Sequence, residues 1–130
     1  MAELREAASA AMRRAYAPYS GFRVGAALLG TDGVIYTGCN VENSSFPAGI
    51  CAERNALVAA VNAGRLEFAH LVIVAGSDSP VPPCGLCRQA LVEFAPELPI
   101  TSVGARGMTE TWSLAELLPA PFTGDSLRRG

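Results

Sequence analysis

Two short cysteine-bearing stretches constrain this chain more than any other feature. Cys51 begins the segment Cys51-Ala52-Glu53-Arg54, and Cys84 and Cys87 form a C-x-x-C pair. Three thiols can fill three of the four positions of a tetrahedral zinc ion and leave the fourth to water, which distinguishes catalytic from structural zinc. Glu53 would lie beside the open position and carry protons. The fold must therefore bring both stretches together, and the pair predicts an active site.

The composition favours one domain that acts on a small molecule. The 130 residues are enough for a single domain, residues 1–130, with its own core. Half of the residues are hydrophobic, which fits a well-filled core or burial between subunits, and composition does not separate the two. The formal charge is −2, and the ten basic residues are all arginine. No basic run is present, so we expect no nucleic-acid partner.

The chain also lacks the signals of membrane insertion or export. No apolar run is long enough to span a bilayer, and we expect no membrane partner. The N-terminal residues 1–14 carry charges throughout, unlike a signal peptide. We therefore expect a cytoplasmic protein, in which thiols stay reduced and clustered cysteines indicate metal binding rather than disulfides.

The pattern of apolar residues and turns predicts a single mixed sheet with helices on its faces. Helices are expected at residues 2–16, 52–63, 84 or 85 to 94 and 114–118, and strands at 22–29, 34–39, 71–75, 100–103 and 108–112. The turn at residues 31–33 makes the first strand pair antiparallel. The link at 104–107 is too short for a crossover helix, so the last two strands are antiparallel as well. This order predicts an α/β fold, a three-layer α/β/α sandwich around a five-stranded mixed sheet.

Both cysteine stretches lie at predicted helix starts. Free N–H groups and partial positive charge at a helix N-terminus lower the pKa of a thiol and favour the thiolate that binds metal. Three thiolates on one zinc ion leave excess negative charge, so we expect Arg54 to donate hydrogen bonds to a thiolate sulfur and withdraw part of that charge. Arg88 could act in the same way or lie in solvent as an ordinary helix arginine, and the sequence leaves both interpretations open.

Other uses of the cysteines remain open. The C-x-x-C pair could be a redox dithiol, or it could belong to a structural zinc-binding module or zinc ribbon with Cys39 as fourth ligand. We interpret Cys39, at the end of an apolar strand, as a core residue. His70 is the single histidine and precedes a buried strand, so we do not assign it as a ligand. One histidine also excludes a catalytic zinc site with two or three histidines.

The cysteine stretches match a known zinc-deaminase signature, in which Glu follows the first ligand by two residues and P-C-x-x-C comes later. Here the signature reads Cys51-Ala52-Glu53 and Pro83-Cys84-Gly85-Leu86-Cys87. With residues 18–26 and 38–43, the chain from Tyr16 to about Leu127 resembles the cytidine deaminase family, in its small homotetrameric three-cysteine form. The Asn-Val-Glu-Asn segment at 40–43 points to free nucleosides. The negative charge and lack of lysine disfavour relatives that act on tRNA or single-stranded DNA.

The resemblance implies zinc-dependent hydrolytic deamination of cytidine and 2′-deoxycytidine to uridine and 2′-deoxyuridine, with release of ammonia, in pyrimidine salvage. Cys51, Cys84 and Cys87 would hold one Zn²⁺ per subunit, and Glu53 would be the catalytic residue. A homotetramer with active sites at subunit interfaces is also implied. A deaminase of a related aminopyrimidine, or of an aminonucleoside such as blasticidin S, shares the signature and remains an alternative.

The resemblance further implies the substrate contacts. Asn40 and Glu42 would hydrogen-bond the ribose, chiefly its 3′-hydroxyl, and Phe22 would pack against the pyrimidine. Backbone groups of Ala52 and Cys84 would meet the edge of the base.

The remaining expectations concern the neighbouring subunit and three departures from the family pattern. Phe122 would reach the pocket of a neighbouring subunit. Phe46 stands where the family often has tyrosine, so a hydroxyl contact is lost there. Pro82 and Pro121 replace less rigid residues and predict altered loop geometry without a change in chemistry.

Overall fold

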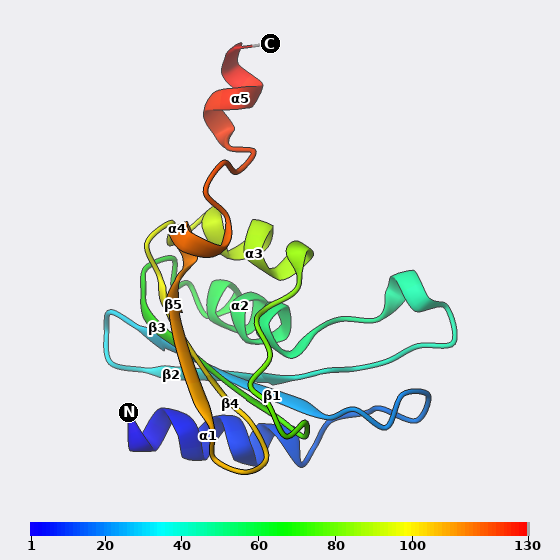
Figure 1. The fold of residues 1–130 in the computed structure, drawn as a ribbon. Helices are drawn as coiled ribbons and strands as arrows, with labels where there is room; N and C mark the ends of the chain where they lie inside the picture. The colour runs from blue at the N-terminus through cyan, green and yellow to red at the C-terminus, as the bar shows by residue number, and fades with distance from the viewer. Residues whose placement is uncertain (130) are drawn as a thin grey trace.

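Five strands form one mixed sheet in the order β2-β1-β3-β4-β5 (Figure 1). The structure is a computed structural model that describes residues 1–129 and the side chains of residues 1–128. The strands are β1 (Val24–Gly30), β2 (Ile35–Cys39), β3 (Phe68–Ala75), β4 (Pro99–Val103) and β5 (Thr109–Ser113). β3 and β4 are parallel, and the other neighbouring pairs are antiparallel. The predicted mixed sheet and its antiparallel last pair are confirmed.

Helices cover both faces of this sheet. They are α1 (Ala2–Met12), α2 (Ala52–Asn62), α3 (Gly85–Val92), α4 (Leu114–Leu117) and α5 (Gly124–Arg129), with a short 3₁₀ helix η1 (Phe46–Ala48). Figure 1 shows α1 on one side of the sheet and α2 and α3 on the other. The three-layer α/β/α architecture is therefore as predicted.

A separate apolar core fills each side of the sheet. Beneath α1, Leu4 packs with Val72 and other buried residues of the sheet. Beneath α2 and α3, Leu91 packs with Leu28 and Ile73. β3 contributes to both cores because alternate residues of a strand point to opposite faces. This explains why residues 71–75 read as a continuous apolar run.

Glycine allows α2 to lie directly against the sheet. A Cβ atom at Gly38, in β2, would come within 2.5 Å of the carbonyl oxygen of Ala52. Real side chains do not tolerate such an approach, so only glycine fits between β2 and the first turn of α2. That turn carries Glu53, and its position on the sheet depends on this contact.

Several predicted boundaries are wrong: β3 begins at Phe68 instead of residue 71, α3 ends at Val92 instead of residue 94, and two more misses lie around the loop between α1 and β1. α1 ends before the predicted residue 16, because the Tyr16 N–H donates to the carbonyl oxygen of Asn40 at 3.0 Å instead of continuing the helix. β1 begins after the predicted residue 22, because the Phe22 N–H donates to the Ser20 hydroxyl at 3.0 Å. The loop is thereby tied to the segment that follows β2.

The last helix, α5, has no counterpart in the predicted element order. It projects from the body of the molecule beyond α3 and α4 (Figure 1). The predicted domain spans residues 1–130, of which Gly130 lies outside the described residues. Within residues 1–129, no helix combines the length and apolarity needed to cross a membrane.

Candidate metal centre and active site

The thiols of Cys51, Cys84 and Cys87 meet at one point on the helical side of the sheet. Cys51 is the N-cap of α2 and Cys84 the N-cap of α3, and both helices pack into the same core. The Cys51 and Cys84 sulfurs lie 3.6 Å apart, the Cys84 and Cys87 sulfurs 3.4 Å apart, and all three within 4.8 Å of one another. Sulfurs on a tetrahedral zinc with bonds of about 2.3 Å would be separated by about 3.8 Å. The cluster therefore fits one zinc ion.

Two further side chains hold the loop that precedes Cys84 in place. The buried Ser102 hydroxyl, in β4, accepts from the Val81 N–H at 3.1 Å and donates to the Val81 carbonyl at 2.7 Å. Arg88 Nε donates to the carbonyl of Pro83 at 2.8 Å. The Arg88 side chain thus holds the backbone of this loop in place, a role different from the two that the sequence left open. Hydrogen bonds between a side chain and a distant backbone leave no periodic signal in a sequence.

Arg54 lies beside the thiols, as the sequence predicted. Its Nη2 atom is 3.9 Å from the Cys51 sulfur. Its Nε atom is buried and has no hydrogen-bond partner among residues 1–129. Burying an unpaired donor is costly, and an electron-rich metal–thiolate centre would satisfy it. Hydrogen bonds from Cys87 and Arg54 lower the pKa of Cys51 to about 5, and the same contact with Cys51 raises the pKa of Cys87. This donor set fits zinc bound by thiolates.

Glu53 is buried in the first turn of α2, with 6% of its surface exposed. Burial, with the charge of Cys51 adding to it, raises the pKa of Glu53 to about 7. Few carboxylates are buried unless a partner or a function offsets the cost. A redox dithiol or a closed structural zinc site needs no such group. A buried carboxylate two residues after a metal ligand can carry protons for a reaction at the metal.

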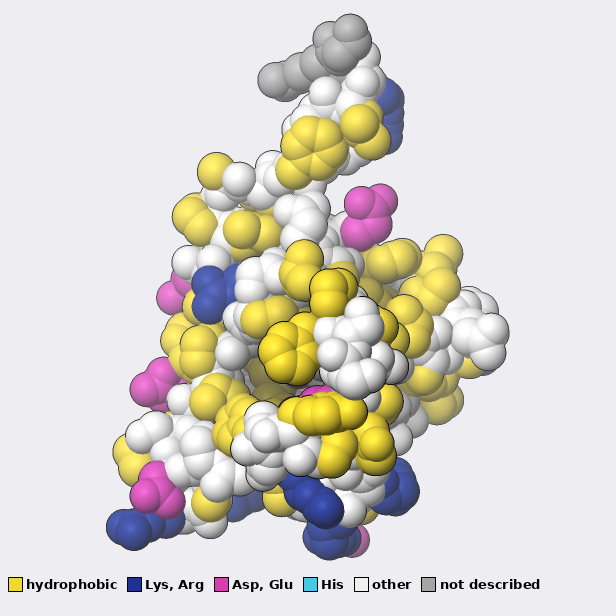
Figure 2. Space-filling view, turned by 90° about the vertical axis from the view of Figure 1, so that its right-hand side faces the viewer, with side chains coloured by type: hydrophobic (Ala, Val, Ile, Leu, Met, Phe, Trp, Pro, Cys, Tyr) yellow, Lys and Arg dark blue, Asp and Glu magenta, His cyan; other side chains and the backbone are white. Residues whose placement is uncertain are grey.

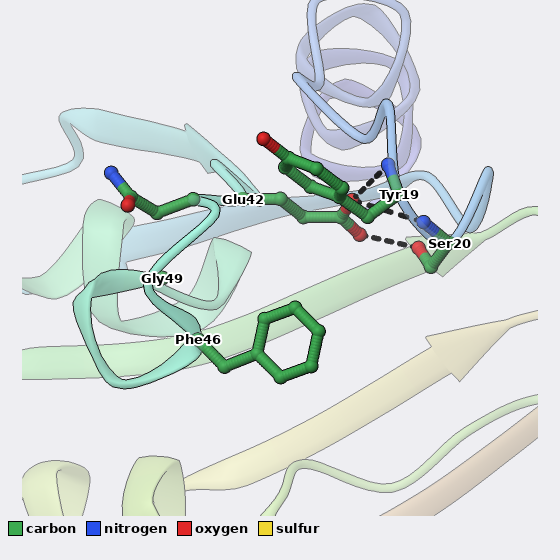
Figure 3. Close-up of a pocket in the computed structure, with 6 residues that line it drawn as sticks. Tyr19, Ser20, Glu42, Phe46 and Gly49 are labelled. Atoms are coloured by element: carbon green, nitrogen blue, oxygen red, sulfur yellow. Dashed lines mark hydrogen bonds between the residues drawn. The ribbon is translucent and has the colours of Figure 1, made fainter.

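Glu42 is held by a turn of the loop before β1 (Figure 3). One carboxylate oxygen, Oε1, accepts from the N–H groups of Tyr19 at 2.9 Å and Ser20 at 3.1 Å. The other, Oε2, accepts from the Ser20 hydroxyl. The Ser20 hydroxyl bond is the main reason that the pKa of Glu42 is lowered. The carboxylate is therefore ionised and can only accept hydrogen bonds.

Asn40 ties the start of β1 to the end of β2. Its side-chain oxygen accepts from the Val24 N–H at 2.9 Å, and its side-chain nitrogen donates to the Phe22 carbonyl at 2.8 Å. An amide group has two hydrogens and two lone pairs, so one donor position and one acceptor position remain. Asn40, predicted only as a ligand contact, therefore also has a structural role that its sequence position did not indicate.

A short backbone ladder places the Asn40–Glu42 segment beside the metal cluster. Val41, between Asn40 and Glu42, exchanges two hydrogen bonds of 3.0 Å with Ile50. Ile50 directly precedes Cys51. The structure therefore brings together the two groups of predicted site residues.

A cavity of about 300 Å³ adjoins this segment. Its lining residues are Tyr19, Ser20, Glu42, Asn43, Phe46 and Gly49. Figure 2 looks onto the side of the molecule toward which the loop between β2 and α2 extends, and this side is hollowed and bordered by hydrophobic side chains. Phe46 is 79% exposed. Phe22, the predicted partner of the pyrimidine, is 38% exposed.

Phe122 is not brought to this site within its own chain. It lies near Val92 and Glu93, at the C-terminal end of α3, whereas Cys84 and Cys87 lie at the N-terminal end. Its carbonyl accepts from Gln89 Nε2 at 2.7 Å, and its side chain is 58% exposed.

Cys39 and His70 lie outside the cluster. Among residues 1–129, the group of potential ligands contains only the three other cysteines. The half-buried Cys39 accepts, through its carbonyl, a hydrogen bond of 2.8 Å from the Asn55 side chain. His70 Nε2 lies 2.8 Å from the Thr101 hydroxyl.

The family model described as "Cytidine and deoxycytidylate deaminase zinc-binding region" matches residues 2–102, which is most of the chain. The chain belongs to this family. Membership confirms the resemblance and the enzyme class, and together with the thiol cluster it identifies zinc as the cofactor.

Individual members of the family are similar over nearly their whole length. The chain is 46% identical to the cytidine deaminase of Sporosarcina psychrophila over 118 residues, which cover 90% of this chain and 87% of that protein. A crystal structure of cytidine deaminase from Burkholderia pseudomallei is 45% identical, has a TM-score of 0.89, and is matched over 93% of this chain and 98% of that one. A crystal structure of cytidine deaminase from Mycobacterium tuberculosis is 40% identical and has a TM-score of 0.81. The match covers 93% of this chain and 95% of that one.

Proposed function

We propose that this deaminase family member hydrolyses cytidine and 2′-deoxycytidine to uridine and 2′-deoxyuridine, releasing ammonia, in pyrimidine salvage. The observation that carries the proposal is the buried Glu53 carboxylate next to a cluster of three thiols. Supporting it, similar proteins such as that of Sporosarcina psychrophila are named cytidine deaminase and are matched over most of their length.

In this proposal Cys51, Cys84 and Cys87 hold one zinc ion per chain. When bound, zinc supplies a Lewis acid that makes water acidic enough to attack near neutral pH. Arg54 stabilises the ionised thiols through the Cys51 sulfur, 3.9 Å from its guanidinium. Ser102 and Arg88 keep the loop before Cys84 in place through backbone hydrogen bonds.

Glu53 moves the protons of the reaction. It takes a proton from the attacking water and delivers it to N3 of the pyrimidine, and the water oxygen adds to C4. Glu53 then takes the proton of the new hydroxyl on C4 and passes it to the amino group. The C4–N bond breaks as the C4 carbonyl forms, and ammonia leaves. One carboxylate serves first as base and then as acid, so no second titratable group is needed.

The substrate would be oriented by groups on both sides of the metal cluster. Asn40 and Glu42 retain free hydrogen-bonding positions for the sugar, chiefly its 3′-hydroxyl, as counted from their contacts. Phe22 would cover one face of the pyrimidine, and backbone groups of Ala52 and Cys84 would meet its edge. These positions suit a free nucleoside better than a polynucleotide.

We further propose a cytoplasmic homotetramer whose active sites lie at subunit interfaces. The hollowed side of the molecule is bordered by hydrophobic side chains (Figure 2), and α2 carries the exposed Val58 and Val61. A subunit interface would bury such surface. Phe122, which lies away from the site of its own chain, would then complete the pocket of a neighbour.

A substrate panel tests the proposed function. Zinc-loaded protein would be incubated with cytidine, 2′-deoxycytidine, cytosine, a cytidine-bearing oligonucleotide and blasticidin S, and ammonia release would be measured. We expect turnover of the two free nucleosides alone. Preference for blasticidin S or for the oligonucleotide would contradict the proposal, and so would zinc binding without turnover of any substrate.

A further inference from the structure

The Ser20 hydroxyl connects two residues predicted to bind opposite ends of a nucleoside. It donates to Oε2 of Glu42, the predicted sugar contact. It also accepts from the N–H of Phe22, the predicted base contact, at 3.0 Å. Figure 3 shows Ser20 and Tyr19 converging on the Glu42 carboxylate beside the cavity. No role for Ser20 follows from the sequence alone.

These bonds leave the Glu42 carboxylate with a defined remaining capacity. A carboxylate offers about four lone-pair positions on its two oxygens. The N–H groups of Tyr19 and Ser20 occupy both positions on Oε1, and the Ser20 hydroxyl occupies one on Oε2. One acceptor position therefore remains, on the oxygen that the Ser20 hydroxyl holds.

The donors that orient this carboxylate are themselves fixed by the backbone. The turn closes through a hydrogen bond of 2.9 Å from the Gly21 N–H to the Ala17 carbonyl, with Gly21 at a φ of 70°. The Glu42 N–H donates to the Tyr16 carbonyl at 2.8 Å. Backbone hydrogen bonds fix both the turn that carries the donors and the segment that carries Glu42. The free acceptor position on Oε2 therefore points in one direction.

We propose that Ser20 is a positioning residue for sugar specificity, which aims the last acceptor position of Glu42 at the 3′-hydroxyl of the nucleoside. The inference rests on the proposed function and deepens it. A site built to hydrogen-bond a substrate hydroxyl rejects an analogue that lacks it. Without the Ser20 hydroxyl, Oε2 has two acceptor positions open to water, and its hydrogen bond to the sugar becomes weaker. The loss falls on substrates that carry the 3′-hydroxyl.

The test compares cytidine with 3′-deoxycytidine in the zinc-loaded protein. In Ser20→Ala we expect the ratio of their kcat/KM values to fall about tenfold, the size expected when a hydrogen bond to a charged group is weakened. The change should appear as a higher KM for cytidine, with kcat nearly unchanged. Ser20→Thr keeps the hydroxyl and should keep the ratio. Ser44→Ala is the matched control, because this exposed serine has no side-chain hydrogen bond within residues 1–129.

Two outcomes would overturn the inference. Equal losses on both nucleosides would show that Ser20 supports only the local structure, and an unchanged ratio would show that it does not aim Glu42. In Glu42→Gln, adding Ser20→Ala should change the ratio no further, and an additive change would also contradict the inference. If the unmodified protein does not turn over cytidine at all, it is the proposed function that fails.

Discussion

Arg54 and Cys51 lie on the same helical turn, with Nη2 of the guanidinium 3.9 Å from the thiol sulfur. The helix that begins with a metal ligand therefore also supplies the positive charge that this ligand needs. Three thiolates would otherwise leave the zinc centre with excess negative charge. The buried Arg54 Nε, without a partner in residues 1–129, is a further donor available to that centre.

Removing this charge should weaken metal binding. For Arg54→Ala we expect zinc affinity to fall about 10- to 100-fold, because interactions that support metal ligands commonly have effects of this size. Arg54→Lys keeps the charge but not the planar group, so its loss should be smaller. Competition with a chromophoric chelator measures the affinity. Arg14→Ala, at an exposed arginine beyond α1, is the control. If Arg14→Ala lowered zinc affinity as much as Arg54→Ala, the proposed role of Arg54 would be contradicted.

Three of the four cysteines should be needed for zinc binding, and the fourth should not. Replacing Cys51, Cys84 or Cys87 by serine should abolish stoichiometric zinc binding, whereas Cys39→Ser should retain one zinc per chain. The reason is that Cys39 lies outside the thiol cluster. Metal analysis after gel filtration measures the content. Loss of zinc from Cys39→Ser would support the closed structural site considered from the sequence.

Glu53→Gln should separate metal binding from turnover. The amide is nearly the same size but cannot carry a proton, so we expect zinc to be retained and kcat to fall by at least about 10²- to 10⁴-fold, the range of general acid–base catalysis. The comparison requires variants with equal zinc content. Glu110→Gln, at an exposed carboxylate in β5, should have normal activity. Near-normal turnover in zinc-loaded Glu53→Gln would remove Glu53 from the mechanism.

Gly38→Ala should disturb both stability and activity. The added methyl group would meet the carbonyl of Ala52 at 2.5 Å, and such overpacking costs about 1–3 kcal/mol of unfolding free energy. Since Ala52 lies between Cys51 and Glu53, activity should fall as well.

Urea unfolding compares Gly38→Ala with Gly76→Ala, whose nearest contact would be an ordinary 3.6 Å. The free energy of unfolding of the Gly76 variant should stay close to that of the unmodified protein. An equal loss of unfolding free energy in both variants would show that α2 does not depend on the close approach at Gly38. If residues 1–130 form one domain, each protein should unfold in a single transition.

Mixed subunits test whether Phe122 acts on a neighbouring chain. We expect sedimentation of the unmodified protein to show a tetramer, and Phe122→Ala and Glu53→Gln each to be weakly active alone. Mixed tetramers should regain part of the activity, because a Phe122→Ala chain keeps Glu53 and can receive Phe122 from its partner. Monomers at working concentration, or mixtures no more active than the separate variants, would contradict the proposed assembly.

The sequence predicted the features that depend on local pattern or on a strong motif. The buried run at 71–75, the turn at 31–33 and the short link at 104–107 were enough to predict a mixed sheet with antiparallel first and last pairs, since burial and turn length act locally. The strand order β2-β1-β3-β4-β5 was not predicted. The spacing of Cys51, Glu53 and the C-x-x-C pair predicted a thiol cluster that the structure contains. The catalytic and substrate-binding roles stay predictions.

What the sequence did not reveal depends on contacts between distant segments. Ser20 reaches Glu42 across 22 residues and Ser102 reaches Val81 across 21, and neither hydroxyl differs in sequence from an ordinary surface serine. The early end of α1 has the same origin, because the Tyr16 N–H bonds to Asn40. α5 was missed because a six-residue, largely exposed helix carries no apolar periodicity.

The most direct test of the proposed function follows cytidine by ultraviolet absorbance in the presence of purified protein. We expect conversion to uridine by the zinc-loaded protein, its loss after removal of zinc with a chelator, and its return when zinc is restored. The absence of any conversion by protein that carries one zinc per chain would contradict the proposed deaminase activity.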